Sequence, residues 1–259
     1  MKIISSKENP IYKTAYKLTK KKYRDKTGCY LLEGVKPLQD ALSMGIRVRN
    51  ILICEGIECP GLFPDEMIAV LTGKLFSMLS DTEASQGVIA VVEKKDSDPL
   101  RFMETAGKKG SNVVVLDRLQ DPGNIGAIIR TAEAAGYKGI LLTSGSGDVY
   151  SPKAARAAAG SLFRMAVLYV KDGREAAAVL KEMGKRIVAT DLSTELCYYD
   201  ADLKHDVALV IGNEGQGVGT DLLEFADLKI RIPMAGSIES LNAAVAAGIL
   251  MYQSCEDKF

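Results

Sequence analysis

Several chemical features are scarce in this chain of 259 residues. It has one histidine, His205, and its five cysteines form no C-x-x-C pair, so we expect neither a disulfide scaffold nor a bound metal. The longest apolar run covers residues 243–252, about half of a membrane span. The first ten residues lack the apolar core of a signal peptide, and we therefore expect a cytoplasmic protein without a membrane partner.

Net charge is also absent, because 33 Lys and Arg residues balance 33 Asp and Glu residues. This balance excludes a protein that covers nucleic acid with its whole surface. The average conceals a basic end, since residues 1–36 contain ten basic and three acidic residues, interleaved with tyrosines. A solvated helix face would explain such a run, but the clustering and the tyrosines favour RNA binding. The predicted RNA-binding residues are Asn9, Lys20, Lys21, Lys22 and Arg24.

Apolar residues make up 47% of the chain, which is typical of a well-packed protein. A charged segment with Pro99 and two glycines interrupts the pattern, and it predicts a linker over 96–111 between a domain at 1–95 and a domain at 112–259. In the first domain we expect a small α/β unit. Its predicted helices cover 5–27, 36–44 and 72–80, and its predicted strands begin at residue 30 and cover 48–54 and 88–92.

The second domain alternates strands and helices more regularly. Strands such as VVVL and VALVI are continuously apolar, as expected for strands that are buried on both faces. The pattern predicts an α/β fold with a mostly parallel sheet covered by helices. The predicted strands cover 113–116, 140–143, 166–170, 186–190, 207–211 and 228–232, and the predicted helices cover 125–135, 152–159, 174–183, 221–225 and 240–253.

Three segments follow strands of this sheet, where ligands gather in open α/β folds. The first motif, DPGNIGAIIRTAEA, predicts a helix that Asn124 opens, with Arg130 six residues further on. Both residues could instead be a plain helix cap and a solvated charge. The second motif, VIGNEGQGVG, places Glu214 among four glycines, a pattern that favours a ligand loop over a simple turn. It matches neither the Rossmann fingerprint nor the P-loop.

The third motif, IPMAGSIESLNAAVAAG, predicts a slim helix that begins near Ser240 and has Asn242 in its first turn. Taken alone, such a helix is more often part of a core than of a site. Together and in this order, however, the three motifs resemble those of the SpoU/TrmH family of RNA ribose 2′-O-methyltransferases, within the SPOUT superfamily. Residues 9–10, 30–36 and 79–92 also resemble the substrate-binding domain of this family.

The resemblance implies a homodimer with a deep trefoil knot that binds S-adenosylmethionine. It implies that the cofactor-binding residues are Thr190, Ile211, Gly212, Gly215, Ile232, Met234 and Leu241. It also implies that the catalytic residues are Asn124, Arg130, Glu214, Ser240 and Asn242. The implied activity is methyl transfer to a ribose 2′-hydroxyl, with ribosomal RNA favoured over transfer RNA as the partner.

The motifs contain no histidine, so the commonest general base is absent. Arg130 is effectively always protonated, and a bidentate clamp on a phosphate is its easier role, although a role as base stays open. For Glu214 we favour a structural role in holding the arginine or backbone N–H groups. Two other functions are kept as alternatives, a nucleotide-cofactor oxidoreductase and an RNA-binding protein without catalysis.

Overall fold

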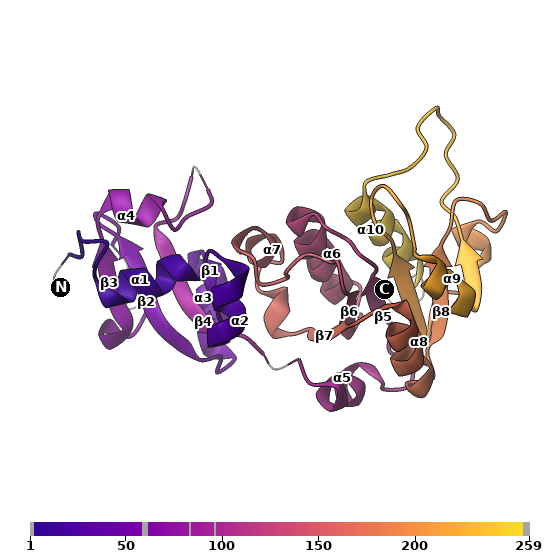
Figure 1. The fold of residues 1–259 in the computed structure, drawn as a ribbon, viewed down its shortest axis with the longest axis horizontal. Coiled ribbons are helices and arrows are strands. Elements are labelled where there is room, and N and C mark those ends of the chain that lie inside the picture. The colour runs from indigo at the N-terminus through magenta and orange to yellow at the C-terminus, as the bar shows by residue number, and fades with distance from the viewer. Residues whose placement is uncertain (1–2, 59–61, 83, 96, 256–259) are drawn as a thin grey trace. The chain divides into compact units, whose positions relative to one another are not determined.

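The computed structural model describes residues 3–58, 62–82, 84–95 and 97–255 (Figure 1). The chain forms two compact units, and the first contains residues 1–95 together with 148–163. The second contains residues 96–147 and 164–259. The unit boundaries therefore divide the chain at residue 95, but they also assign part of the predicted second domain to the first unit.

A mixed sheet of four strands, in the order β1-β4-β2-β3, forms the centre of the first unit. β4 pairs antiparallel with β1 and β2, while β3 runs parallel to β2. Its core includes Tyr12, Leu31, Leu52 and Ile89, all buried. The strands are β1 Cys29–Glu33, β2 Val48–Cys54, β3 Ile68–Leu71 and β4 Val88–Glu93, and the helices are α1 Pro10–Lys17, α2 Lys21–Thr27, α3 Val35–Ser43, α4 Gly73–Ser77 and α7 Pro152–Ala157.

The single basic helix predicted over 5–27 is wrong, because the structure has two helices there. Asn9 caps α1 by accepting bonds from the N–H groups of Ile11 and Tyr12, and Pro10 follows at the first helical position. α2 ends at Gly28, which has a left-handed φ of 64°. The sequence does not predict β3, because a strand of four residues gives little pattern.

Arg24 is a second correction, because its side chain is buried. Its Nε and Nη2 each lie 2.8 Å from Oδ2 of Asp148, and its Nη1 donates to the carbonyl of Leu18. With 3% of the residue exposed, the guanidinium is held inside the unit instead of being available for the predicted contact with RNA. Lys20, Lys21 and Lys22 are exposed, and their contact with RNA stays a prediction.

Six parallel strands, in the order β10-β8-β9-β5-β6-β7, form the sheet of the second unit. This confirms the predicted parallel α/β fold. β5, β6 and β9 are buried along their whole length. The strands are β5 Val113–Leu116, β6 Gly139–Thr143, β7 Ala166–Val170, β8 Arg186–Thr190, β9 Val207–Ile211 and β10 Leu228–Ile230, and the helices are α5 Pro99–Ala106, α6 Pro122–Ala134, α8 Gly173–Glu182, α9 Thr220–Phe225 and α10 Ala243–Gln253.

Helices cover both faces of this sheet. α5, α8 and α9 contribute to one core with alternate strand residues, and α6 packs against α10 on the opposite face (Figure 1). The strand order fits the trefoil knot that the resemblance implies, and the knot itself stays a prediction.

The described part of the predicted linker, residues 97–111, includes a helix. It contains α5, whose Phe102 is 2% exposed and belongs to the core of the second unit. The segment 148–163 packs in the first unit, where the Tyr150 ring lies 4.9 Å from that of Tyr30. A truncation near residue 111 would therefore remove the packing partners of this segment.

Candidate active site

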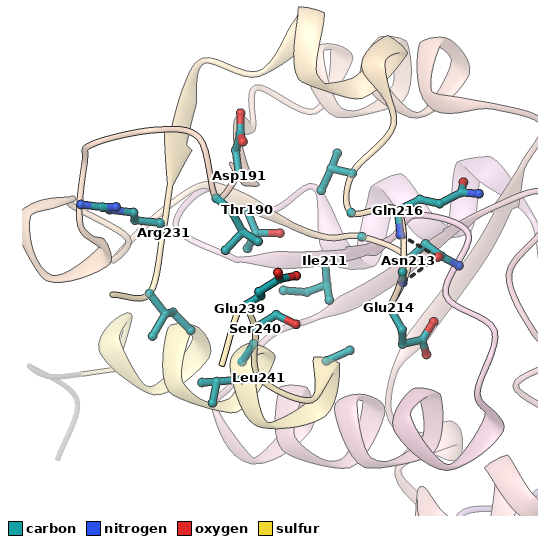
Figure 2. Close-up of a pocket in the computed structure, with 18 of the residues that line it drawn as sticks. Thr190, Asp191, Ile211, Asn213, Glu214, Gln216, Arg231, Glu239, Ser240 and Leu241 are labelled. Atoms are coloured by element: carbon teal, nitrogen blue, oxygen red, sulfur yellow. Dashed lines mark hydrogen bonds between the residues drawn. The ribbon is translucent and has the colours of Figure 1, made fainter. Parts of the chain in front are cut away.

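The residues predicted to bind the cofactor gather where four neighbouring strands of the second unit end. β10, β8, β9 and β5 are adjacent and parallel, so their carboxyl ends meet at one edge. A cavity of about 560 Å3 lies at this edge (Figure 2). All seven residues predicted to bind the cofactor line it: Thr190, Ile211, Gly212, Gly215, Ile232, Met234 and Leu241.

A tight glycine loop after β9 forms one wall of the cavity. Asn213 and Gly217 exchange two backbone hydrogen bonds, and Oδ1 of Asn213 accepts bonds from the N–H groups of Gly215 and Gln216. A Cβ atom on Gly212 would lie 2.2 Å from the carbonyl carbon of Gly217. The second motif therefore needs glycine at residue 212 for its own backbone to pack.

Gly215 differs from Gly212, because a Cβ atom there would meet only Oδ1 of Asn213, at 3.7 Å. The cavity combines aliphatic walls, such as Ile211 and Leu241, with polar groups such as Thr190 and Asp191. S-adenosylmethionine also combines a flat adenine with a ribose and a charged amino-acid end. The size and the mixed chemistry of the cavity fit this cofactor.

Hydrogen bonds join the three motifs at the cavity. Nδ2 of Asn242 donates to Oδ1 of Asn124 at 2.9 Å, and Nδ2 of Asn124 donates to Oε1 of Glu214 at 3.2 Å. Glu214 also accepts bonds from the backbone N–H groups of Gln120 and Asp121. The structure thus brings three of the predicted catalytic residues together, and Glu214 holds backbone and amide groups, not the arginine.

The starts of two helices differ from the prediction. Asp121, not Asn124, caps α6, with Pro122 at the first helical position. Asn242 is the cap of α10, which begins at Ala243 instead of near Ser240. In both cases the capping side chain accepts bonds from backbone N–H groups, and this leaves the amide of Asn124 free to join the network between motifs.

The pKa of the Glu214 carboxyl lies below its usual value. Burial raises this pKa, but hydrogen bonds from its own backbone, from Asn124, and from the N–H groups of Asp121 and Gln120 outweigh the effect of burial and lower it. Glu214 is therefore ionised at neutral pH and acts here as an acceptor. It is not a proton donor.

The other two predicted catalytic residues lie outside this network. Ser240 lines the cavity and is exposed. Arg130 is exposed on α6 and, among the residues that the structure describes, its side chain makes no hydrogen bond or ion pair. A free guanidinium is suited to an incoming anion.

Sequence reasoning missed two residues that support the site, Asp117 and Arg118. Asp117 is 2% exposed and accepts bonds from the Gly219 N–H at 2.7 Å and from the Thr143 hydroxyl at 2.8 Å. Arg118 has a φ of 55°, and its Nη2 donates to Asp117 and to the Gly217 carbonyl. The position of Asp117, an acidic residue directly after a buried strand, could have indicated its role. The sequence contains no signal for the positive φ of Arg118.

Two further properties concern metals and membranes. Within residues 3–58, 62–82, 84–95 and 97–255, no group of three His, Cys, Asp or Glu side chains could hold a metal ion. No helix in these ranges has the length and apolar character needed to cross a membrane.

Known proteins are similar to this chain over both units. The pattern of the SpoU rRNA Methylase family matches residues 111–252, and that of the MRM3-like substrate binding domain matches residues 9–90. RlmP of Bacillus subtilis, a 23S rRNA (guanosine(2553)-2′-O)-methyltransferase, is 36% identical, with 97% of this chain and 98% of the relative covered. A 23S rRNA (uridine(2479)-2′-O)-methyltransferase of Streptomyces viridochromogenes is 33% identical over 91% of this chain and 85% of its own.

A solved structure agrees with these relatives. The AdoMet-bound rRNA methyltransferase from Sinorhizobium meliloti has a TM-score of 0.87 and 31% identity, and the match covers 100% of this chain and 98% of that one. The fold and the cavity thus define a methyltransferase of the SPOUT class that uses S-adenosylmethionine and acts on RNA, as predicted. The chain belongs to the SpoU rRNA methylase family.

Proposed function

We propose that this enzyme transfers a methyl group from S-adenosylmethionine to a ribose 2′-hydroxyl of ribosomal RNA. One observation carries the proposal. The amides of Asn124 and Asn242 and the carboxylate of Glu214 form one hydrogen-bonded network beside the cavity that the seven predicted cofactor residues line. Two relatives that match along nearly the whole chain, RlmP and the Streptomyces enzyme, are named as 23S rRNA methyltransferases, and this favours ribosomal over transfer RNA.

The chemistry requires alignment more than activation of the methyl group. When bound, the cofactor supplies a sulfonium methyl that is already electrophilic, whereas a ribose hydroxyl is a poor nucleophile at neutral pH. The residues of the site must therefore hold the hydroxyl in line with the methyl group and assist loss of its proton. Ser240 and the network of Asn124 and Asn242 offer neutral hydrogen bonds for this positioning.

Arg130 is proposed as a clamp on the phosphate next to the target ribose. Its guanidinium presents a planar set of donors that matches two phosphate oxygens. It is exposed on α6, the helix that also carries Asn124, so phosphate and ribose would be held by one rigid element. The positive charge would also stabilise the oxyanion that develops on the ribose.

The first unit is proposed to capture the RNA. Lys20, Lys21 and Lys22 are exposed at the start of α2. Asn9 is half-buried and its Oδ1 already caps α1, so its contact with RNA would use the remaining Nδ2 group. Arg24 is left out of this surface because it is buried.

A homodimer is part of the proposal, and α10 supports it. Val245 and Tyr252 are 52% and 50% exposed, and with Ile249 between them they form an apolar stripe at helical spacing. A second copy of the chain would cover this stripe. We also propose a cytoplasmic location, because the proposed substrate is ribosomal RNA.

The test is transfer of tritiated methyl from S-adenosylmethionine to purified RNA. We expect label in ribosomal RNA that lacks the modification, at a nucleotide whose 3′ linkage becomes resistant to alkali, because a methylated 2′-oxygen cannot attack the phosphate. Transfer RNA is the control substrate. Label in transfer RNA alone, or in a base instead of a ribose, would contradict the proposal.

A further inference from the structure

Three carboxylates line the cavity, and two of them are already engaged. Asp191 accepts bonds from the N–H group and the hydroxyl of Ser193, and Glu214 holds the first motif. Among the described residues, Glu239 has no hydrogen bond or ion pair. Figure 2 shows its carboxylate in the cavity, between Thr190 and Ile211 and on the same side as Ser240. Glu239 is therefore a free carboxylate in the lining of the site, on a residue that is itself exposed.

Arg231, the one basic residue among the described residues that line the cavity, does not neutralise this charge. Arg231 belongs to the lining, but Figure 2 shows its guanidinium pointing away from Glu239. Glu239 is an exposed residue of the lining, so water screens its attraction for a cation, and the effect on affinity is that of a solvent-exposed charge pair. The ligand that fits the cavity should therefore carry a positive charge near Glu239.

We propose that Glu239 recognises the sulfonium charge of S-adenosylmethionine and thereby selects this substrate over the product, S-adenosylhomocysteine. The inference rests on the proposed place of the cofactor in this cavity. Glu239 directly precedes Ser240, and the methyl group must be delivered beside Ser240, Asn124 and Asn242. The sulfonium, to which that methyl group is attached, would thus be the cationic centre on this side of the cavity.

The charge balance of the reaction gives Glu239 its role. Methyl transfer breaks the sulfur–methyl bond and forms a bond to the ribose oxygen; the bonding electron pair stays on sulfur, and the hydroxyl proton passes to water. The sulfur thereby becomes neutral, so the product loses the partner of Glu239. Because the positive charge already decreases in the transition state, Glu239 stabilises the bound substrate more than the transition state. It acts in selection and product release, and it does not accelerate the chemical step.

The experiment is isothermal titration of the full-length protein with each of the two ligands. Glu239→Gln keeps the shape and removes the charge, and we expect S-adenosylmethionine affinity to fall about fivefold, the upper end of the scale for a solvent-exposed charge pair. Affinity for S-adenosylhomocysteine should change by less than about twofold. The control is Glu224→Gln, on the exposed side of α9 and outside the cavity, which should change neither affinity.

A kinetic measurement separates selection from a structural effect. With saturating cofactor, the single-turnover rate of Glu239→Gln should not fall, whereas a collapsed site would lower it. Equal weakening of both ligands would assign Glu239 to the ammonium group that they share and would overturn the inference, as would an unchanged affinity ratio. If the unaltered protein bound neither ligand, the proposed function itself would fail.

Discussion

The buried ion pair of the first unit makes a strong prediction about Arg24. Its side chain is 4% exposed and that of Asp148 is 7% exposed, and two guanidinium nitrogens approach the same carboxylate oxygen at 2.8 Å. In Arg24→Ala, the Asp148 carboxylate would keep the Tyr150 N–H as a partner but lose its counter-charge. Removing one member of a buried pair costs about 3–5 kcal/mol of unfolding free energy.

Thermal unfolding measures this cost. At about 2–4 °C for each kcal/mol, the melting temperature should fall by roughly 6–20 °C. The chain has no tryptophan, so the tyrosine signal in near-ultraviolet circular dichroism reports on the packed Tyr30 and Tyr150 rings. Lys21→Ala, an exposed residue of the same helix, should stay within about 0.5 kcal/mol of the unaltered protein.

RNA binding should depend on the exposed lysines and not on the buried Arg24. Replacing Lys20, Lys21 and Lys22 by alanine should weaken RNA binding and reduce its salt dependence, because phosphate contacts are lost. The reasoning would be refuted if Arg24→Ala were as stable as the unaltered protein and weakened RNA binding as much as Lys21→Ala. Arg24 would then be an exposed RNA contact, as the sequence alone suggests.

Three further predictions concern the candidate active site. Gly212→Ala should abolish S-adenosylmethionine binding by calorimetry, because its Cβ atom would collide with the Gly217 backbone, whereas Gly215→Ala should bind; equal affinities would contradict the loop geometry. Arg130→Lys should keep cofactor affinity but lower the single-turnover rate with saturating RNA by at least roughly a hundredfold, and a near-parental rate would exclude the clamp. The lowered pKa of Glu214 means that its hydrogen bonds stabilise the site above the usual value of 4.5 and are lost as pH falls through the lower folded value. Cofactor affinity should therefore persist at about pH 5 and fall in more acidic solution, and Glu214→Gln should remove this dependence.

Much of the second unit could be predicted from the sequence, because its strands are continuously apolar and its motifs follow them. β5, β7, β8 and β9 begin and end where predicted. The starts of α6 and α10 were harder to predict. For α6, Asp121 and Asn124 are both good caps, and only the folded backbone shows that Asp121 is the one used.

Long-range pairing explains what the sequence could not predict. The partner of Arg24 lies 124 residues away, so its burial has no local signal. The bond between Asn242 and Asn124 joins residues 118 positions apart. The motif resemblance identified both residues, but which groups they bind depends on the folded chain.

The most direct test of the central claim is a nucleotide-resolution map of ribose 2′-O-methylation in ribosomal RNA. Cells that lack this protein would be compared with cells that carry it and with cells that carry Arg130→Lys. We predict that one ribosomal ribose methylation disappears without the protein, returns with the unaltered chain and stays absent with the variant. Identical ribosomal maps in all three cell types would contradict the account.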